Sequence, residues 1–437
     1  MRILVSAAVI GGLFVTAPRA DSQSASLTPA ERAIVSYIDS HNDEAIALLE
    51  RVVNVNSGTQ NLAGVRRVGD IFRAELDALG FRTTWVDGAG WQRAGHLVAT
   101  HPGTGAPILL IGHLDTVFEP DSPFQKFDRL DATSARGPGI IDMKGGDVIM
   151  IQALKALDAA GLLKSLPVVV VMTGDEEASG RPLATAREAL TTSATGARAA
   201  LGFEDGDGHP AHAVVARRGS TNWRLDVTGK AAHSSLIFSD DLGSGAIFEA
   251  ARILNTFRDR LAGQAHLTFN PGVIAGGTSV QVDPAQSRGT AAGKTNVIAE
   301  RATVLGDIRA LTKDQFATAQ ATMQQIATSS LPHTVSTLAF DEGYPPLAPS
   351  AGNEQLLVAY DRASRDLGFG AVTAVNPDRA GAADVSFVAG IVPMIIDALG
   401  MKGRDGHTSN ETADLTALPM QSKRAAVLIS RLASGRQ

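Results

Sequence analysis

Two short runs of apolar residues, with a helical pattern between them, constrain the fold of this chain more than any other feature. Residues 107–112 form a continuous apolar run that ends in Gly, and residues 167–172 form a second run rich in Val. Between them, residues 144–163 place apolar side chains at helical spacing. A buried strand, a helix and another buried strand predict a parallel sheet with a crossover connection.

The pattern changes after about residue 212. Trp223, Leu225 and Val227 alternate with polar residues, which predicts strands with one solvated face, and helical stretches follow at 243–262 and 312–330. The buried-strand pattern returns at residues 391–396. We therefore expect one α/β domain interrupted by a smaller α+β domain. The expected boundaries are 21–212 and 331–437 for the two parts of the α/β domain and 213–330 for the insert.

The N-terminus has the pattern of an export signal. Arg2 precedes an apolar stretch over residues 3–15, and Ala17 and Ala20 have the spacing of a cleavage site before Asp21. A signal peptide at residues 1–20 predicts a periplasmic or secreted protein, with no membrane association after its removal. The alternative is that this segment is retained as an anchor.

Composition excludes several classes of chemistry. The chain has no Cys, so disulfides, thiolate metal sites and thiol nucleophiles are excluded, and any metal must be held by His, Asp and Glu. With 39 basic and 45 acidic residues the net charge is −6, which gives no support to nucleic-acid binding.

Acidic and imidazole side chains follow the predicted buried strands. His113 follows the first, Glu176 and Glu177 follow the second, and Glu204 follows a third at about residues 199–201. Further candidates are Asp142, which opens a helix, and His407, which lies past the last buried run. Each alone fits a loop residue or a helix N-cap, but ligands in open α/β sheets gather at the carboxyl ends of strands. Adjacent carboxylates such as Glu176 and Glu177 also repel each other unless they share a cation or a proton.

Seven short motifs occur in the order of one known family. They are His113-Leu-Asp-Thr-Val117, Gly139-Ile-Ile-Asp-Met-Lys-Gly-Gly146, Thr173-Gly-Asp-Glu-Glu177 with Phe203-Glu204, Val227-Thr-Gly-Lys-Ala-Ala-His-Ser234, Asn296-Val-Ile298, Gly306-Asp-Ile-Arg309 and Gly406-His-Thr-Ser-Asn-Glu411. This set resembles the dinuclear zinc aminoacylase and carboxypeptidase family, which includes acetylornithine deacetylase, succinyl-diaminopimelate desuccinylase and carboxypeptidases of the G type. The resemblance, closest to the carboxypeptidase G branch, implies a zinc-exopeptidase-like catalytic domain with a mainly parallel sheet and a ferredoxin-like lid and dimerisation domain.

The resemblance also implies a metal centre with a general base. Two Zn²⁺ per chain would share Asp142 and a water or hydroxide, with His113 and Glu204 on one ion and Glu177 and His407 on the other. Asp115 would orient the imidazole of His113, and Glu176 would act as the general base. A cis peptide bond is implied after Asp142.

The insert would supply substrate contacts and a dimer interface. By the resemblance, His233 reaches the site of the partner subunit in a homodimer, Arg309 binds the free carboxylate of the substrate, and Asn296 adds a hydrogen bond. Where glutamate-preferring relatives have a Lys and an Arg for the side-chain carboxylate, this chain has His212 and Tyr344. Arg217 and Arg218 are the alternatives for the missing charge.

The function expected from these residues is that of a zinc-dependent carboxypeptidase. It would hydrolyse the amide bond next to a free C-terminal carboxylate in small peptides or N-acyl amino acids, by a metal-bridging hydroxide with Glu176 as general base. An apolar or broad C-terminal residue is expected. The alternatives are an N-acyl-amino-acid deacylase and a non-catalytic binding protein of the same fold.

Overall fold

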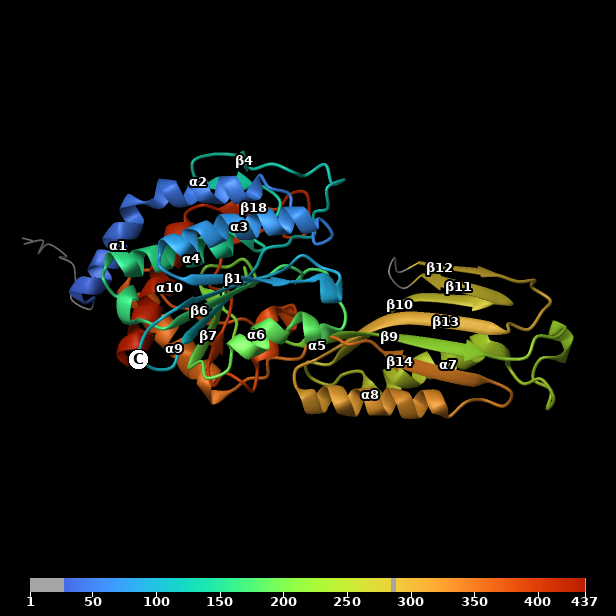
Figure 1. Cartoon of the computed structure of the whole chain (residues 1–437). Helices are drawn as coiled ribbons and strands as arrows, with labels where there is room; N and C mark the ends of the chain where they lie inside the picture. Colours follow the sequence, from blue (N-terminus) through green and yellow to red (C-terminus); the bar gives the residue numbers. More distant parts are fainter. Residues whose placement is uncertain (1–26, 284–287, 437) are drawn as a thin grey trace, which may run out of the picture.

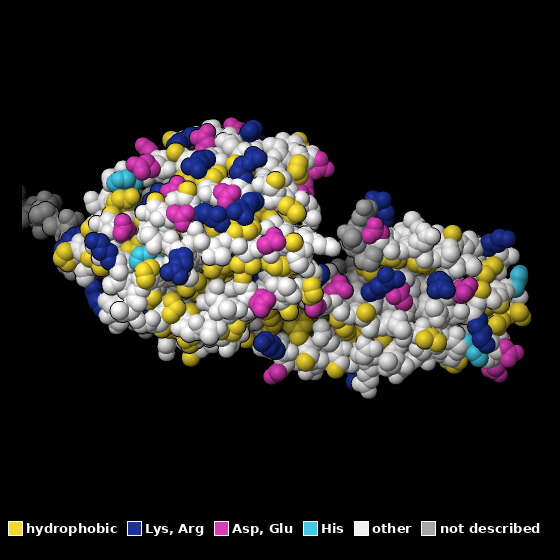
Figure 2. All heavy atoms as spheres, viewed as in Figure 1, with side chains coloured by type: hydrophobic (Ala, Val, Ile, Leu, Met, Phe, Trp, Pro, Cys, Tyr) yellow, Lys and Arg dark blue, Asp and Glu magenta, His cyan; other side chains and the backbone are white. Residues whose placement is uncertain are grey.

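The computed structural model describes residues 27–283 and 288–436 and has two lobes (Figure 1). The main domain contains both ends of the described chain, and the insert extends from one side of it as an elongated second lobe. Charged side chains of both signs are interspersed over the face shown in Figure 2. The expected signal at residues 1–20 lies outside the described residues. Within the described ranges, no helix has the length and hydropathy needed to cross a bilayer.

The central sheet of the main domain confirms the predicted crossover. Its order is β1-β2-β6-β3-β7-β16, and the four strands from β6 to β16 are parallel to one another. The strands are β1 (Arg82–Asp87), β2 (Gly95–His101), β3 (Ile108–His113), β6 (Val168–Thr173), β7 (Ala199–Gly202) and β16 (Ile395–Ile396). The helix between β3 and β6 is α4 (Lys144–Ala159).

Both faces of this sheet are covered, which explains the continuous apolar runs. Ile108 and Leu110 of β3 pack in the larger core, whereas Leu109 and Ile111 pack in a second core on the opposite face. The larger core is formed with α1 (Pro29–Ser40), α2 (Asn42–Val53), α3 (Leu62–Ala78), α4, α9 (Ala351–Asp366) and α10 (Ala417–Ser434). The second core includes side chains of α6 (Glu188–Ser193) and of the 3-10 helix Asp384–Val388 (η5); the short helix α5 (Leu183–Ala186) precedes α6.

The insert has the expected ferredoxin-like fold. Its elements follow in the order β9 (Gly219–Thr228), α7 (Gly245–Leu261), β10 (Thr268–Gly277), β13 (Arg301–Ala310), α8 (Lys313–Thr328) and β14 (Val335–Phe340). The sheet order β10-β13-β9-β14 is antiparallel throughout, with the two helices against one face. A hairpin of β11 (Ser279–Asp283) and β12 (Arg288–Ala292) lies beside β10. Because β14 pairs with β9, the sheet extends ten residues past the boundary expected at 330.

The C-terminal apolar run forms less strand than its pattern indicates. Only Ile395 and Ile396 pair with β7, and Ile391 is 41% exposed. Pro393 has no backbone N–H to donate to a ladder, so the run cannot pair along its whole length. Short strands complete the main domain: β4 (Asp128–Arg129), β5 (Ser134–Arg136), β17 (Gly403–Arg404) and β18 (Thr412–Asp414) in one sheet, and β8 (His212–Ala213) with β15 (Thr373–Ala374).

Candidate metal centre

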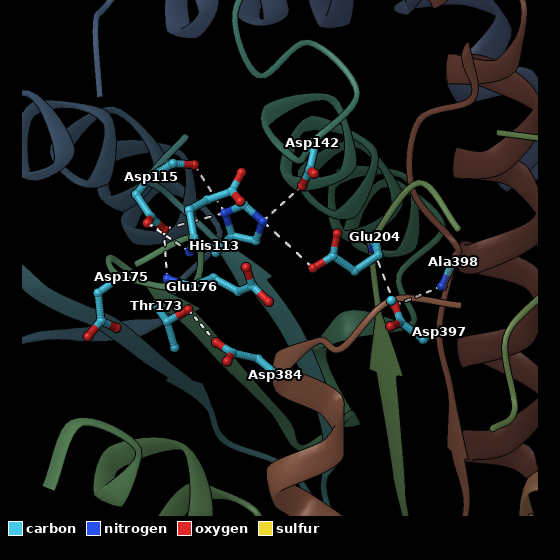
Figure 3. A network of polar contacts seen from close by, with 12 residues as sticks. His113, Asp115, Asp142, Thr173, Asp175, Glu176, Glu204, Asp384, Asp397 and Ala398 are labelled. Carbon is cyan, nitrogen blue, oxygen red and sulfur yellow. Dashed lines mark hydrogen bonds and ion pairs between the residues drawn. The ribbon is translucent and has the colours of Figure 1, made fainter. Parts of the chain in front are cut away.

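The polar clusters that follow the strands converge at one edge of the central sheet (Figure 3). His113 is the last residue of β3, Glu176 and Glu177 follow β6, and Glu204 follows β7. Parallel neighbours end at the same edge, so the side chains at their carboxyl ends are brought together.

The ligand atoms form two groups that share Asp142. In the first, His113 Nε2 lies 3.1 Å from Asp142 Oδ1 and 3.6 Å from Glu204 Oε1. In the second, His407 Nε2 lies 2.8 Å from Asp142 Oδ2 and 3.3 Å from Glu177 Oε2. Within each group the ligand atoms all lie within 4.8 Å of one another. The arrangement therefore offers two adjacent three-residue sites with one bridging carboxylate.

These donors fit divalent metal ions. Glu177 Oε1 is buried without a hydrogen-bond partner, which is costly for a carboxylate unless a cation binds there. Burial raises the pKa of Glu177 to about 7, and it raises the pKa of Glu204 well above its usual range. Hydrogen bonds to Asp142 and Glu177 raise the pKa of His407 to about 11. A metal ion at this position would bind the neutral imidazole of His407.

Asp115 contacts both His113 and the loop that carries Glu176 and Glu177. Its carboxylate lies 3.5 Å from His113 Nδ1, which leaves Nε2 of that ring free to face Asp142. It also accepts hydrogen bonds from the backbone N–H groups of Glu176 (3.0 Å) and Glu177 (3.1 Å), and from Thr59 Oγ1 (2.6 Å). One buried carboxylate therefore couples the end of β3 to the loop after β6.

Asp142 is held by the turn before α4. Glu411, which is buried, accepts hydrogen bonds from the backbone N–H groups of Gly139, Ile141 and Asp142. The Asp142–Met143 peptide bond is cis, as the resemblance implied. A Cβ on Gly146 would lie 1.9 Å from the carbonyl oxygen of Phe203, so only glycine lets the start of α4 approach β7 this closely.

Glu176 lies beside the two metal groups and belongs to neither. No described residue hydrogen-bonds its carboxylate, which points toward Glu204 in Figure 3. Burial raises the pKa of Glu176 well above its ordinary value of 4.5, although the charge of His113 acts against this. A raised pKa suits a group that must accept a proton and later release it near neutral pH.

The candidate residues of the insert lie at opposite ends of its sheet. Arg309 is near the end of β13 closest to the main domain, where its Nε lies 3.1 Å from Asp307. At the other end of the sheet, His233 follows β9 and Asn296 precedes β13, and a bridge between His233 and Val297 joins the two loops. Each strand has ten residues, or about 30 Å at roughly 3.3 Å per residue. The structure therefore does not bring His233 and Asn296 to the metal centre of their own chain.

The residues expected around the substrate side chain are engaged with other groups. His212 Nδ1 lies 2.8 Å from Asp207, and the Tyr344 hydroxyl contacts Arg187. Arg217 is 4% exposed and binds Asp397 at 2.7 Å, so its charge is already neutralised. The Nη atoms of Arg218 donate to Thr268 Oγ1 and to the Asp378 carbonyl.

Three positioning residues did not emerge from the sequence as site residues. Glu411 holds the Asp142 turn, Asp397 accepts a hydrogen bond from the Glu204 N–H (3.3 Å), and Arg187 binds the acidic loop after β6. Glu411 stands four residues after His407 in the last motif, which was a usable signal. Asp397 follows a buried run, whereas Arg187 stands in an ordinary helical stretch that gives no such signal.

Fold and site together define a class of two-domain α/β enzymes with a candidate metal centre at the carboxyl ends of the parallel strands. Comparison with known families and proteins identifies the family within this class to which the chain belongs. Residues 109–431 match the model of peptidase family M20/M25/M40, and the chain belongs to this family. The resemblance drawn from the motifs is thereby confirmed, and family membership makes the protein a metal-dependent hydrolase.

Relatives and solved structures agree with this assignment. The chain is 26% identical to carboxypeptidase G2 of Pseudomonas sp. (strain RS-16) over 397 residues, or 90% of each protein. Aminopeptidase PepT from Bacillus cereus superposes with a TM-score of 0.72 at 20% identity, covering 90% of this chain and 99% of that one. The YXEP protein of Bacillus subtilis, a dinuclear metal-binding peptidase of the M20 family, has a TM-score of 0.61 at 16% identity, covering 91% and 99%. At these identities the two solved structures support the fold alone.

Proposed function

We propose that this protein is a zinc-dependent carboxypeptidase that hydrolyses the amide bond next to a free carboxylate, in small peptides or N-acyl amino acids. The observation that carries the proposal is the pair of metal-ligand groups sharing Asp142, with Glu176 unligated beside them. The likeness to carboxypeptidase G2 over 90% of both chains favours a substrate cut next to its C-terminal carboxylate. Deacylation of N-acyl amino acids is the second candidate, since partial matches to acetylornithine deacetylase also occur.

Each residue has a task in this reaction. Asp142, His113, Glu204, Glu177 and His407 would hold two Zn²⁺, which suit a shell of imidazole and carboxylate ligands. When bound, the metal pair would polarise the scissile carbonyl and lower the pKa of a water molecule. Glu176 takes the proton of the attacking water and passes it to the leaving nitrogen. Arg309 would bind the free carboxylate through a bidentate pair, and the 39% exposure of its side chain supports this role.

A homodimer would complete the site. His233 would polarise the scissile carbonyl from the partner subunit, with Asn296 beside it, because both lie at the end of the insert that is farther from the main domain, about one ten-residue strand (roughly 30 Å) away from its near end. Around them the insert exposes large apolar side chains that an interface would cover: Leu236, Phe238, Ile247, Phe248 and Ile274. Ile274 belongs to β10, which is an edge strand of the four-stranded sheet.

The direct test combines metal analysis with a substrate panel. The purified protein should contain about two Zn²⁺ per chain, because the five ligand residues form two groups that share Asp142. A chelator should abolish hydrolysis of N-acyl amino acids and dipeptides, added zinc should restore it, and C-terminal amides of the same substrates should be poor. Full activity of strictly metal-free protein, or equal activity on amidated substrates, would contradict the proposal.

A further inference from the structure

The loop that carries Glu176 is held by the buried guanidinium of Arg187. Arg187, between α5 and α6, is 1% exposed. Its Nη1 binds Asp175 Oδ1 at 2.6 Å and its Nε binds Asp384 Oδ1 at 2.8 Å. The other oxygen of Asp384 accepts a hydrogen bond from Thr173, the last residue of β6 (Figure 3). Arg187 thus forms ion pairs with both aspartates: Asp175, which directly precedes Glu176, and Asp384, which is bonded to Thr173 at the end of β6.

The remaining donors of Arg187 reach the residues that follow. Nη2 donates to the Asp175 carbonyl (3.1 Å), to Ser179 Oγ (2.9 Å) and to the hydroxyl of Tyr344 (2.7 Å). The Tyr344 hydroxyl in turn donates to the carbonyl oxygen of Glu176 at 2.9 Å. Since a hydroxyl has one proton, this bond fixes its orientation, and the contact with Ser179 (3.0 Å) uses a lone pair.

Tyr344 belongs to one of the two segments that connect the domains. Its N–H and carbonyl exchange hydrogen bonds with Ser220 (2.9 and 3.0 Å), and Leu347 pairs in the same way with Arg217. Ser220 lies at the start of β9, whereas Arg217 precedes β9, and Tyr344 and Leu347 follow β14, on the side of the main domain. A second contact also joins the main domain to this connecting segment: the backbone N–H of Leu183, in α5, donates a hydrogen bond to the Glu342 carboxylate. The loop of the base is therefore tied to the interdomain connection.

We propose that Arg187 and Tyr344 are positioning residues for Glu176, and that they make the orientation of the base depend on the position of the insert. This inference rests on the proposed function, in which Glu176 is the general base. It assigns Tyr344 a task different from lining the side-chain pocket of the substrate. Both Tyr344 and Arg187 act through the backbone of the loop and touch no reacting atom.

The first test is Tyr344→Phe, which removes only the hydroxyl. We expect kcat to fall by about tenfold, the scale of one lost hydrogen bond, with KM and metal content unchanged. The factor should be the same for every substrate of a panel, because a displaced base slows each reaction equally. Tyr360→Phe is the matched control: Tyr360 is buried in α9, its hydroxyl contacts Gln421 at 3.3 Å, and its loss should leave kcat unchanged.

A second measurement does not depend on activity. Hydrogen exchange of the backbone amides in residues 173–180 should be faster in Tyr344→Phe than in the wild type and in Tyr360→Phe. Arg187→Lys keeps a positive charge between the two aspartates but lacks the planar guanidinium with its several donors. Like Tyr344→Phe, it should lower kcat and speed up amide hydrogen exchange in residues 173–180. An inactive wild type would refute the proposed function, while the hydrogen-exchange data would still report on the connection between Tyr344 and the loop of Glu176. Unchanged kcat and exchange in Tyr344→Phe, or a change in KM that differs between substrates, would overturn the inference.

Discussion

Glu176 and Glu177 are adjacent carboxylates whose surroundings give them different tasks. Asp115 accepts a hydrogen bond from the backbone N–H of each, which holds the backbone of both residues in place. Glu177 then lies 3.3 Å from His407, within a metal-ligand group, whereas the carboxylate of Glu176 has no hydrogen-bond partner in the described chain. One glutamate is thus available to a metal, and its neighbour is available to a proton.

Replacement of Glu176 by Gln should separate binding from catalysis. The amide keeps the shape of the side chain but cannot accept a proton, so kcat should fall by about 10² to 10⁴. Metal content, measured by elemental analysis, should stay near that of the wild type. Glu177→Gln is the paired variant and should lose metal. If Glu176→Gln lost the metal instead, the two glutamates would have exchanged roles.

Substrate preference should reflect the absence of a free cation at the positions expected to bind the substrate side chain. Arg217 is committed to Asp397, and His212 and Tyr344 provide no permanent cation. A substrate carboxylate placed there would lack charge-assisted hydrogen bonds of about 1.5–3 kcal/mol each. We therefore expect an acyl-amino acid with an apolar or aromatic side chain to have a higher kcat/KM than acyl-glutamate. The measurement compares one acyl group on Glu, Leu, Phe and Ala, and a tenfold preference for Glu over the others would contradict it.

At the scale of elements, the first and last helices of the described chain are joined by a buried ion pair. Arg431 of α10 lies 2.7 Å from Glu31 of α1, which is 1% exposed, and 2.8 Å from Asp366 at the end of α9. Glu31 also completes a capping box with Thr28 at the start of α1. The contact therefore fixes both the start of α1 and its packing on the C-terminal helix.

Glu31→Gln should destabilise the protein in a pH-dependent way. Burial acts to raise the pKa of Glu31, but the hydrogen bonds from Arg431 and Thr28 and the charge of Arg431 together outweigh it and lower the pKa below 4.5. Because the folded state favours the carboxylate, its contribution is complete above pH 4.5 and is lost as the pH falls through the lowered value. Near pH 7, urea unfolding should show a loss of about 1.5–3 kcal/mol, which shrinks in acid.

The control for this variant is Glu44→Gln on α2. Glu44 is exposed, so its replacement should change the free energy of unfolding by less than about 0.5 kcal/mol. A difference between wild type and Glu31→Gln that stayed constant down to pH 3 would show that the charge of Glu31 is not what stabilises the helix pair.

At the scale of the whole molecule, the insert carries candidate substrate-binding residues at both of its ends. Its near end carries Arg309, while its far end carries His233 together with exposed apolar residues such as Phe238 and Phe248. A homodimer formed through the far end would place His233 at the partner's metal centre and cover these side chains. This arrangement predicts that neither subunit has a complete site by itself.

Mixed dimers test that prediction. His233→Ala and Glu176→Gln should each be nearly inactive, because each lacks one part of every site. After random exchange at equal amounts, about half of the dimers are mixed, and each mixed dimer has one complete site out of two. Activity should therefore recover to about a quarter of the wild-type value. Verified heterodimers without activity would place His233 in the site of its own subunit or outside catalysis.

The sequence by itself determined the type of fold and the chemistry of the site. The apolar runs around residues 108–111 and 168–172 required a parallel sheet buried on both faces, and strand polarity alone brings His113, Glu177 and Glu204 to one edge. Tertiary structure decided what holds these residues in place. Arg187 is 197 positions from Asp384, and Glu411 is 269 from Asp142, and no local pattern encodes such pairs. It also decided that β14 joins the insert and that Pro393 shortens the last strand, since strand pairing depends on partners that lie far away in the chain.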